Sequence, residues 1–136
     1  MNYIPEEKFN EIVSKYLPRL RCDRTKAPVD YEEMALWIDE LSYIKARLQS
    51  EASFAESELK RITANTYIML KSNPAKYGLP EKVSETALKI MLEGSDDVLK
   101  AKRDLYECTF RFDRIAGMLS AMYVKKDFVA ICEKNY

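Results

Sequence analysis

Histidine is missing from the 136-residue sequence. Catalytic pairs of serine or cysteine with histidine, and metal sites ligated by histidine, are therefore excluded within one chain. The three glycines, Gly78, Gly94 and Gly117, stand alone, so the sequence has no glycine-rich phosphate loop. Adjacent carboxylates such as Asp96 and Asp97 point about 100° apart on a helix and do not converge on one substrate atom. We expect no enzymatic activity, no metal and no cofactor.

Net charge and long apolar runs are missing as well. The 22 basic residues balance the 22 acidic ones, which excludes a strongly basic, histone-like protein. Apolar runs stay near four residues, as at 67–70, and are too short to span a bilayer. Pro5 and charged residues interrupt the first positions, so we identify no signal peptide and expect a cytoplasmic protein. Cys22, Cys108 and Cys132 are odd in number and widely spaced, which predicts reduced thiols that pack as small apolar residues.

Helical periodicity dominates what is present. Apolar residues make up 47% of the chain, enough for a core, and the length suits one domain. Pro5 opens a short helix that ends at Pro18, and a basic connector follows to residue 29. We therefore divide the chain into an N-terminal helix and connector, 1–29, and a main helical part, 30–136. The fold class is all-α.

A long central helix is predicted from Asp30, which is a good N-cap, to about Lys71, because no glycine or proline intervenes. Its 42 or so residues would extend roughly 63 Å. A heptad pattern typical of coiled-coil packing runs through it, with one charged intrusion. Its positions are Met34, Ile38, Leu41, Lys45, Leu48, Ala52, Ala55, Leu59, Ile62, Thr66 and Met69.

The second half of the chain predicts a loop at 72–80, a short helix capped by Ser84, and a last long helix capped by Ser95. The pattern of that last helix softens near Lys125, where we expect a separate terminal helix. Its heptad positions are Val98, Ala101, Leu105, Cys108, Phe112, Ile115, Leu119 and Met122. A second stripe beside it contains Leu99, Lys102, Tyr106, Phe110, Asp113 and Gly117.

The lengths of these helices predict self-association. A compact chain of this size has a diameter of roughly 37 Å, which cannot cover a helix of about 63 Å. A long antiparallel hairpin of the two long helices would still leave apolar edges open. The alternative is an intrachain hairpin whose central helix breaks near 49–53.

Basic residues close to tyrosines are the candidates for binding. Lysine and arginine neutralise phosphates and aromatic rings stack on bases, which is the combination that single-stranded nucleic acid requires. The candidate residues are Lys60, Arg61, Lys71, Lys76, Tyr77, Arg19, Arg21 and Arg24.

A family resemblance extends these inferences. Residues 76–78, 84–92, 95–100, 112–122 and 125–131, with Trp37, Ser42, Ile44, Lys45 and 59–61 upstream, resemble the UvsY family of bacteriophage recombination mediators. The resemblance covers roughly residues 30–132. It implies a small all-helical protein that forms a ring-like homo-oligomer of about six to eight subunits in the host cell cytoplasm.

The resemblance also implies a function. Such a protein binds single-stranded DNA without sequence preference and helps a phage recombinase displace the single-strand-binding protein. Lys60 and Arg61 match the family's DNA contacts. The stretch that matches the family's assembly helices contains Phe112, Ile115, Leu119, Met122, Phe128 and Ile131.

Two other functions fit the same pattern. A phage adaptor or inhibitor would use the long helices and tyrosines to bind one protein partner without DNA. A structural or chaperone component of a virion is the third reading. Fluorescence anisotropy with a single-stranded oligonucleotide separates the first reading from the other two.

Overall fold

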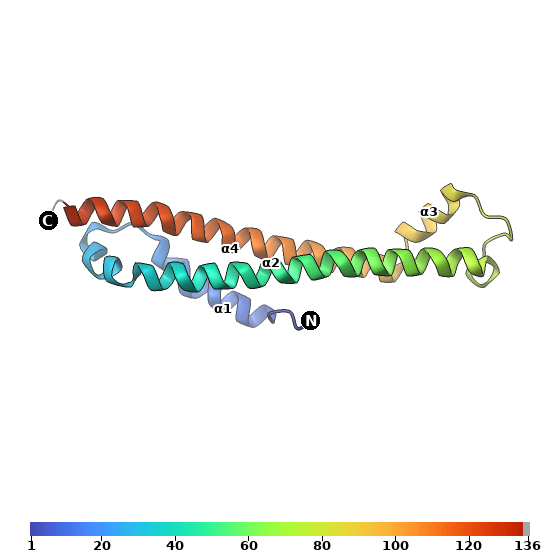
Figure 1. Ribbon diagram of the computed structural model, residues 1–136, viewed down its shortest axis with the longest axis horizontal. Helices are drawn as coiled ribbons and strands as arrows, with labels where there is room; N and C mark the ends of the chain where they lie inside the picture. The colour runs from blue at the N-terminus through green and yellow to red at the C-terminus, as the bar shows by residue number, and fades with distance from the viewer. Residues whose placement is uncertain (135–136) are drawn as a thin grey trace. The chain divides into compact units, whose positions relative to one another are not determined.

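The chain is all-helical over residues 1–134, the part that the computed structural model describes, and no strand occurs there. Three short 3₁₀ helices, labelled η, interrupt four α-helices (Figure 1). The order is α1 (Glu6–Tyr16), η1 (Pro18–Leu20), η2 (Arg24–Lys26), α2 (Ala27–Ser72), η3 (Pro74–Tyr77), α3 (Glu85–Glu93) and α4 (Asp96–Lys134). The all-α prediction is confirmed.

The chain divides into two compact units. The terminal unit contains residues 1–50 and 110–134, and the middle unit contains 51–109. Each unit receives one segment of α2 and one of α4. Phe9 and Tyr16 of α1 share a core with α2 and α4, so residues 1–29 belong structurally to the terminal unit.

The start of α2 differs from the predicted one. The helix begins at Ala27, with Pro28 in its first turn, where the amide hydrogen that proline lacks has no helical partner anyway. Asp30 therefore lies inside the helix and is not its N-cap. Asp23 instead caps η2, accepting hydrogen bonds from the Thr25 amide at 3.0 Å and the Thr25 hydroxyl at 2.7 Å.

Continuity of α2 is confirmed, since all 46 residues are helical without a break at 49–53. Met34, Leu41 and Leu48, spaced seven residues apart, are buried as predicted. Between them Trp37 is buried as well, and the predicted Ile38 is half-buried and packs against the same core. Lys45 is half-buried, with its ammonium 5.9 Å from the Phe112 ring centroid.

The predicted heptad loses register at the far end of α2. Met69 is exposed and Leu70 is buried. An α-helix of 3.6 residues per turn drifts about 20° per heptad against a strict seven-residue repeat. Five heptads from Met34 amount to about 100°, which is one residue. The buried face of α2 therefore follows the helical period of 3.6.

The α4 helix continues through Lys125 to Lys134, so the predicted separate terminal helix does not form. Its buried face includes the predicted Ala101, Cys108, Ile115 and Met122, each seven residues from the next. The alternate positions in the terminal unit differ from prediction. They are Arg111, Met118, Lys125 and Cys132. Leu119 is also buried, whereas Leu105 and Phe112 are half-buried.

The two buried cations of α4 are bound by groups from the N-terminal region. Lys125 pairs with Asp30 at 2.7 Å, donates a hydrogen bond to the Arg19 carbonyl, and lies 5.4 Å from the Trp37 ring centroid. Arg111 donates to the Ile4 carbonyl, and its guanidinium lies 5.1 Å from the Phe9 ring centroid. These contacts fasten the N-terminal segment and the connector to α4. Neither residue is among the predicted heptad positions of this helix.

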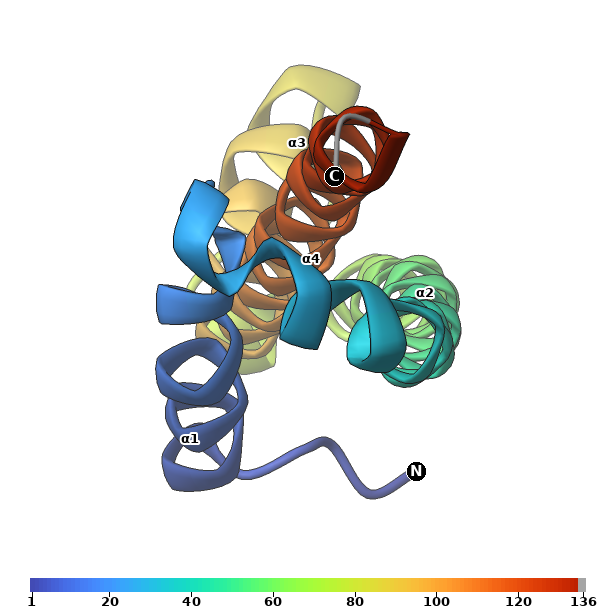
Figure 2. The same ribbon diagram turned by 90° about the vertical axis from the view of Figure 1, so that its left-hand side faces the viewer.

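The terminal unit is built from three side-by-side helices, α1 and the antiparallel segments of α2 and α4 (Figures 1 and 2). Its core residues are Phe9, Tyr16, Met34, Trp37, Leu41, Leu48, Ile115, Met118, Met122 and Val129, with others around them. Three apolar faces meet there, which removes most of the large side chains of this unit from water.

The middle unit contains the remaining α2 segment, η3, α3 and the start of α4. The Ser84 hydroxyl caps α3, accepting a hydrogen bond from the Ala87 amide at 3.1 Å, as predicted. Gly78 ends η3 with a φ of 73°, a left-handed conformation that favours glycine. The buried apolar residues of this unit are Ala55, Leu70, Leu88, Val98, Ala101 and Cys108.

The second stripe of α4 is exposed along its whole length. Leu99, Tyr106 and Phe110 are its apolar members, and their exposed fractions reach 73% at Tyr106. The three cysteines are free thiols. Cys108 and Cys132 are buried as expected, whereas Cys22 is exposed on the connector.

Candidate functional site

Lys60 and Arg61 lie on the surface of α2 in the middle unit, and each pairs with a glutamate of the same helix. The Lys60 ammonium is 3.6 Å from a Glu56 oxygen. The Arg61 guanidinium binds both Glu58 oxygens, through Nε at 3.1 Å and Nη2 at 2.7 Å. These hydrogen bonds lower the pKa of Glu58 and raise the pKa of Arg61. Both cations are exposed, and each has a carboxylate beside it.

Lys71 belongs to a small cluster that connects α2 to the start of α3. Its ammonium lies 3.4 Å from the Tyr67 hydroxyl, 5.5 Å from the Tyr67 ring centroid and 4.0 Å from a Glu85 oxygen. The Tyr67 hydroxyl contacts both Glu85 oxygens at 3.3 Å. A cation, a ring and a carboxylate thus meet at one exposed position. The sequence pattern had not singled out Tyr67, although its i, i+4 spacing to Lys71 could have done so.

Helix geometry relates these cations to one another. Lys60 and Lys71 are eleven residues apart, which places them on nearly the same face of α2, about 16 Å apart along the axis. Tyr67 lies between them on that face. Arg61 is turned by about 100° from Lys60. Lys76, with its ammonium 5.9 Å from the Tyr77 ring centroid, lies in η3 of the same unit.

The predicted residues of the connector lie in the terminal unit. Arg19 packs over two rings, 5.6 Å from the Tyr16 centroid and 5.1 Å from the Trp37 centroid, and is half-buried. Its guanidinium therefore covers the core. Arg21 and Arg24 are exposed. The connector is built by η1 and η2, so its cations project from ordered backbone.

Most of the predicted assembly residues pack inside the protomer. Ile115, Leu119 and Met122 are buried in the core of the terminal unit, and Phe112 and Phe128 pack against it. Ile131 is the exposed member of the six, with 60% of its surface open. An assembly surface on this protomer therefore has to be sought among other exposed side chains.

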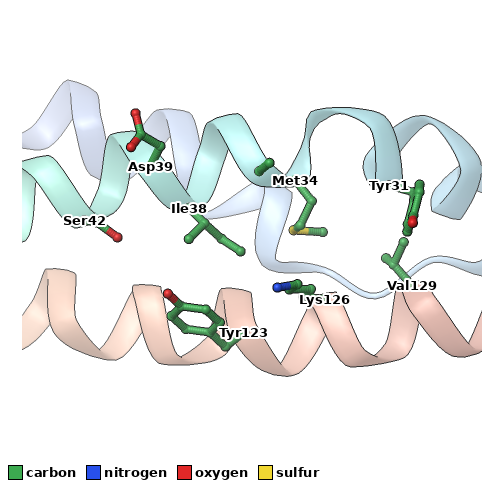
Figure 3. A pocket seen from close by; sticks show the side chains of 9 residues that line it. Tyr31, Met34, Ile38, Asp39, Ser42, Tyr123, Lys126 and Val129 are labelled. Carbon is green, nitrogen blue, oxygen red and sulfur yellow. The ribbon is translucent and has the colours of Figure 1, made fainter.

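An open groove of about 540 Å³ lies between α2 and α4 of the terminal unit. None of the residues predicted to bind DNA or to join subunits lines it. Figure 3 shows Tyr123 and Lys126 of α4 extending toward α2, where Ile38 and Met34 lie opposite. The lining combines apolar side chains with Asp39, Ser42, Lys126 and two tyrosines.

Residues 1–134 contain no group of three or more histidine, cysteine, aspartate or glutamate side chains arranged to bind a metal ion. Among the helices of that same range, none combines the length and the apolarity needed to cross a bilayer.

Comparisons with known proteins add no relative. No protein-family model, no curated protein and no solved structure matches the chain. Function therefore has to be argued from the residues and their geometry.

Proposed function

We propose that this protein is a recombination mediator that binds single-stranded DNA without sequence preference and assembles into a ring. In this proposal it loads a phage recombinase onto DNA by helping it displace the single-strand-binding protein in the host cytoplasm. The observation that carries the proposal is the exposed α2 face on which Lys60 and Lys71 flank Tyr67. The sequence resemblance to UvsY-type mediators supports it.

The chemistry requires no bond making. A DNA phosphate replaces a glutamate as the partner of Lys60 or Arg61, because exposed ion pairs contribute little to stability and exchange easily. The flat faces of Tyr67 and Tyr77 provide stacking surfaces for unpaired bases next to the cations. Such contacts read no base edges, so the binding is independent of sequence. Repetition of a weak patch around a ring raises the avidity.

The dependence of DNA affinity on salt concentration tests whether Lys60 and Arg61 contact phosphates. Each phosphate contact to a single strand contributes about 0.7 to the slope of log affinity against log salt. We expect the Lys60→Ala/Arg61→Ala double variant to lower affinity for a labelled dT oligonucleotide about tenfold and to reduce that slope by about 1.4. Anisotropy titrations across a salt series measure both quantities.

A matched control exists in the same unit. Lys102 and Arg103 are also adjacent and exposed, on α4, and do not line the groove that Arg61 shares with Lys100. Lys102→Ala/Arg103→Ala should leave the affinity and the slope unchanged. Equal effects of the control and the Lys60→Ala/Arg61→Ala variant would show that Lys60 and Arg61 are not the DNA contacts, and the absence of wild-type binding at low salt would reject the function.

A protein–protein adaptor is the second candidate, and one observation favours it. Exposed apolar side chains lie on the outer faces of both long helices, including Leu36 and Tyr43 on α2 and Leu99 and Tyr106 on α4. Such side chains fit a protein surface better than a phosphate backbone. An adaptor would bind a protein target tightly and show no affinity for the oligonucleotide.

A further inference from the structure

An apolar groove of the terminal unit lies open to water. It measures about 440 Å³ and lies between η1 and α4, where Leu17 and Leu20 face Phe110 and Gly117. Leu17 and Phe110 are 47% and 54% exposed, so large apolar area remains in water. Exposed apolar patches of this kind mark places where another surface packs.

Gly117 gives this groove an open floor. Glycine within a helix is unfavourable, because it adds backbone freedom to the unfolded chain. A Cβ added at Gly117 would have no neighbouring atom within 4 Å, so the protomer itself does not require glycine there. Close approach of a second surface explains a residue that has no side chain at this position.

The charge around the groove is basic on its η1 side. Asp113 and Arg114 both line the groove and balance each other. Leu20 is followed directly by the connector, where residues 21–26 contain Arg21, Arg24 and Lys26 against one acid, Asp23. All three of these cations are exposed. A partner with apolar and acidic side chains would complement this surface.

One surface of the same chain has that character. Glu32, Leu36, Asp39 and Tyr43 are spaced i, i+4, i+7 and i+11 on α2 and are all exposed, so they form one strip. Its Asp39 and Tyr43 end adjoins α1, where Lys8 and Lys15 line a groove with these two residues, so the Glu32 and Leu36 end is the more acidic one. From Ala27 to Ile44 α2 contains five acidic residues and no basic one. Leu36 and Tyr43 are 58% and 70% exposed. The strip therefore presents apolar side chains between carboxylates.

Strip and groove are different parts of the terminal unit. The strip lies on α2, whereas the groove is lined by Leu17, Leu20 and residues of α4. A contact between the strip of one copy and the groove of another joins two different surfaces. Such head-to-tail contacts repeat from copy to copy and generate a ring when the rotation closes.

We propose that the α2 strip of one copy docks into the η1–α4 groove of the next. Leu36 and Tyr43 pack against Leu17, Leu20 and Phe110 over Gly117. Glu32 and Asp39 pair with the connector cations of the neighbour. This inference rests on the ring-forming part of the proposed function, and it names the surface that forms the ring.

Filling the groove is the first test, read by sedimentation velocity without DNA. Gly117→Leu adds a side chain where the protomer has free space, and we expect self-association at least tenfold weaker than that of the wild type. Ser120→Leu, at an exposed position of the same helix that does not line the groove, is the matched control and should assemble normally. Normal assembly of Gly117→Leu, or a wild type that stays a 15.9 kDa protomer at tens of micromolar, overturns the inference.

Exchanging the charges is the second test, and it identifies the partner surfaces. Glu32→Lys/Asp39→Lys makes the strip basic, and Arg21→Glu/Lys26→Glu makes the connector acidic. Each variant alone should dissociate, and an equimolar mixture should reassemble, because each then has an opposite charge to meet. Failure of the mixture to reassemble while both variants keep the helical circular dichroism of the wild type overturns the pairing.

DNA binding is scored separately on the same samples. A wild type that assembles through the groove but binds no oligonucleotide would reject the mediator function and leave the contact intact. A wild type that stays monomeric but binds the oligonucleotide would reject the contact and leave DNA binding intact.

Discussion

The terminal and middle units bury different kinds of side chains. The terminal unit buries aromatic and large aliphatic residues such as Trp37 and Leu41, together with two cations whose partners lie on its N-terminal segment. The middle unit buries smaller residues such as Ala55 and Ala101, and the carboxylate of Glu51. Its ion pairs at Lys60, Arg61 and Lys71 are all on the surface.

The two units therefore differ in what they contribute: the terminal unit contributes stability, and the middle unit presents the exposed ion pairs. Burial of large side chains contributes about 1.5–3 kcal/mol each, so the terminal unit supplies most of the hydrophobic stabilisation. Regions with little buried apolar area open locally at lower free energy. The middle unit, which presents the proposed DNA contacts, is therefore the part that can adapt to a ligand.

We expect the largest loss of stability when the buried ion pair of the terminal unit is broken. Lys125→Ala leaves the Asp30 carboxylate buried without a partner, which should cost about 3–5 kcal/mol of unfolding free energy. Urea denaturation followed by circular dichroism measures it. Lys126→Ala, at the exposed neighbouring position, should change stability by less than about 0.5 kcal/mol. Equal losses for the two variants would contradict the role of Lys125.

Substitutions in the cores of the two units should lower stability less, and in different ways in each unit. Leu41→Ala opens a cavity among aromatic side chains of the terminal unit and should lower the global unfolding free energy by about 2–5 kcal/mol. Leu88→Ala removes the buried side chain of the short helix α3 and should mainly release that helix. Hydrogen exchange by mass spectrometry distinguishes them. We expect faster exchange throughout the terminal unit for Leu41→Ala and faster exchange confined to α3 and its flanking loop for Leu88→Ala.

Alanine substitutions at two glycines, one in each unit, should change the stability in opposite directions. Gly117→Ala should stabilise the protein by about 0.5–1 kcal/mol, because α4 gains helix propensity and the new Cβ meets no atom. Gly78→Ala should destabilise the middle unit by about 1–2 kcal/mol, because alanine disfavours a φ of +73°. Thermal denaturation of both variants gives the signs, and a stabilised Gly78→Ala would show that the left-handed turn does not persist.

The smallest effects concern one carboxylate in each unit. Hydrogen bonds from Thr25 lower the pKa of Asp23 in the terminal unit, and hydrogen bonds from Arg61 lower the pKa of Glu58 in the middle unit. The stability that each contributes is present above its unfolded pKa and is lost as pH falls through the lowered folded pKa. Carboxyl-carbon NMR titration should show Glu58 returning toward its ordinary pKa of 4.5 in Arg61→Gln, with Asp23 unaffected. A Glu58 pKa unchanged by that substitution would mean that the pair does not form in solution.

Sequence patterning determined the elements of this protein. Prolines and glycines end the helices, Ser84 caps α3, and the seven-residue spacing of Met34, Leu41 and Leu48 identifies the buried side of α2. These features depend on neighbours within a few turns of the chain, which is why local physics suffices to predict them. The candidate DNA residues on α2 also come from the sequence, from basic positions near tyrosines and from the family resemblance, and they stay a prediction.

Tertiary structure alone decided which side chains share an environment. Lys125 and Arg111 occupy core positions because carboxylate and carbonyl partners arrive from residues more than 90 positions away, and charge by itself argues against burial. The one-residue drift that buries Leu70 instead of Met69 accumulates over five heptads of packing. The same packing covers most of the residues expected to join subunits and leaves the α2 strip and the η1–α4 groove open. A pattern on one helix records that a face is apolar, but the neighbouring helices determine whether that face is covered.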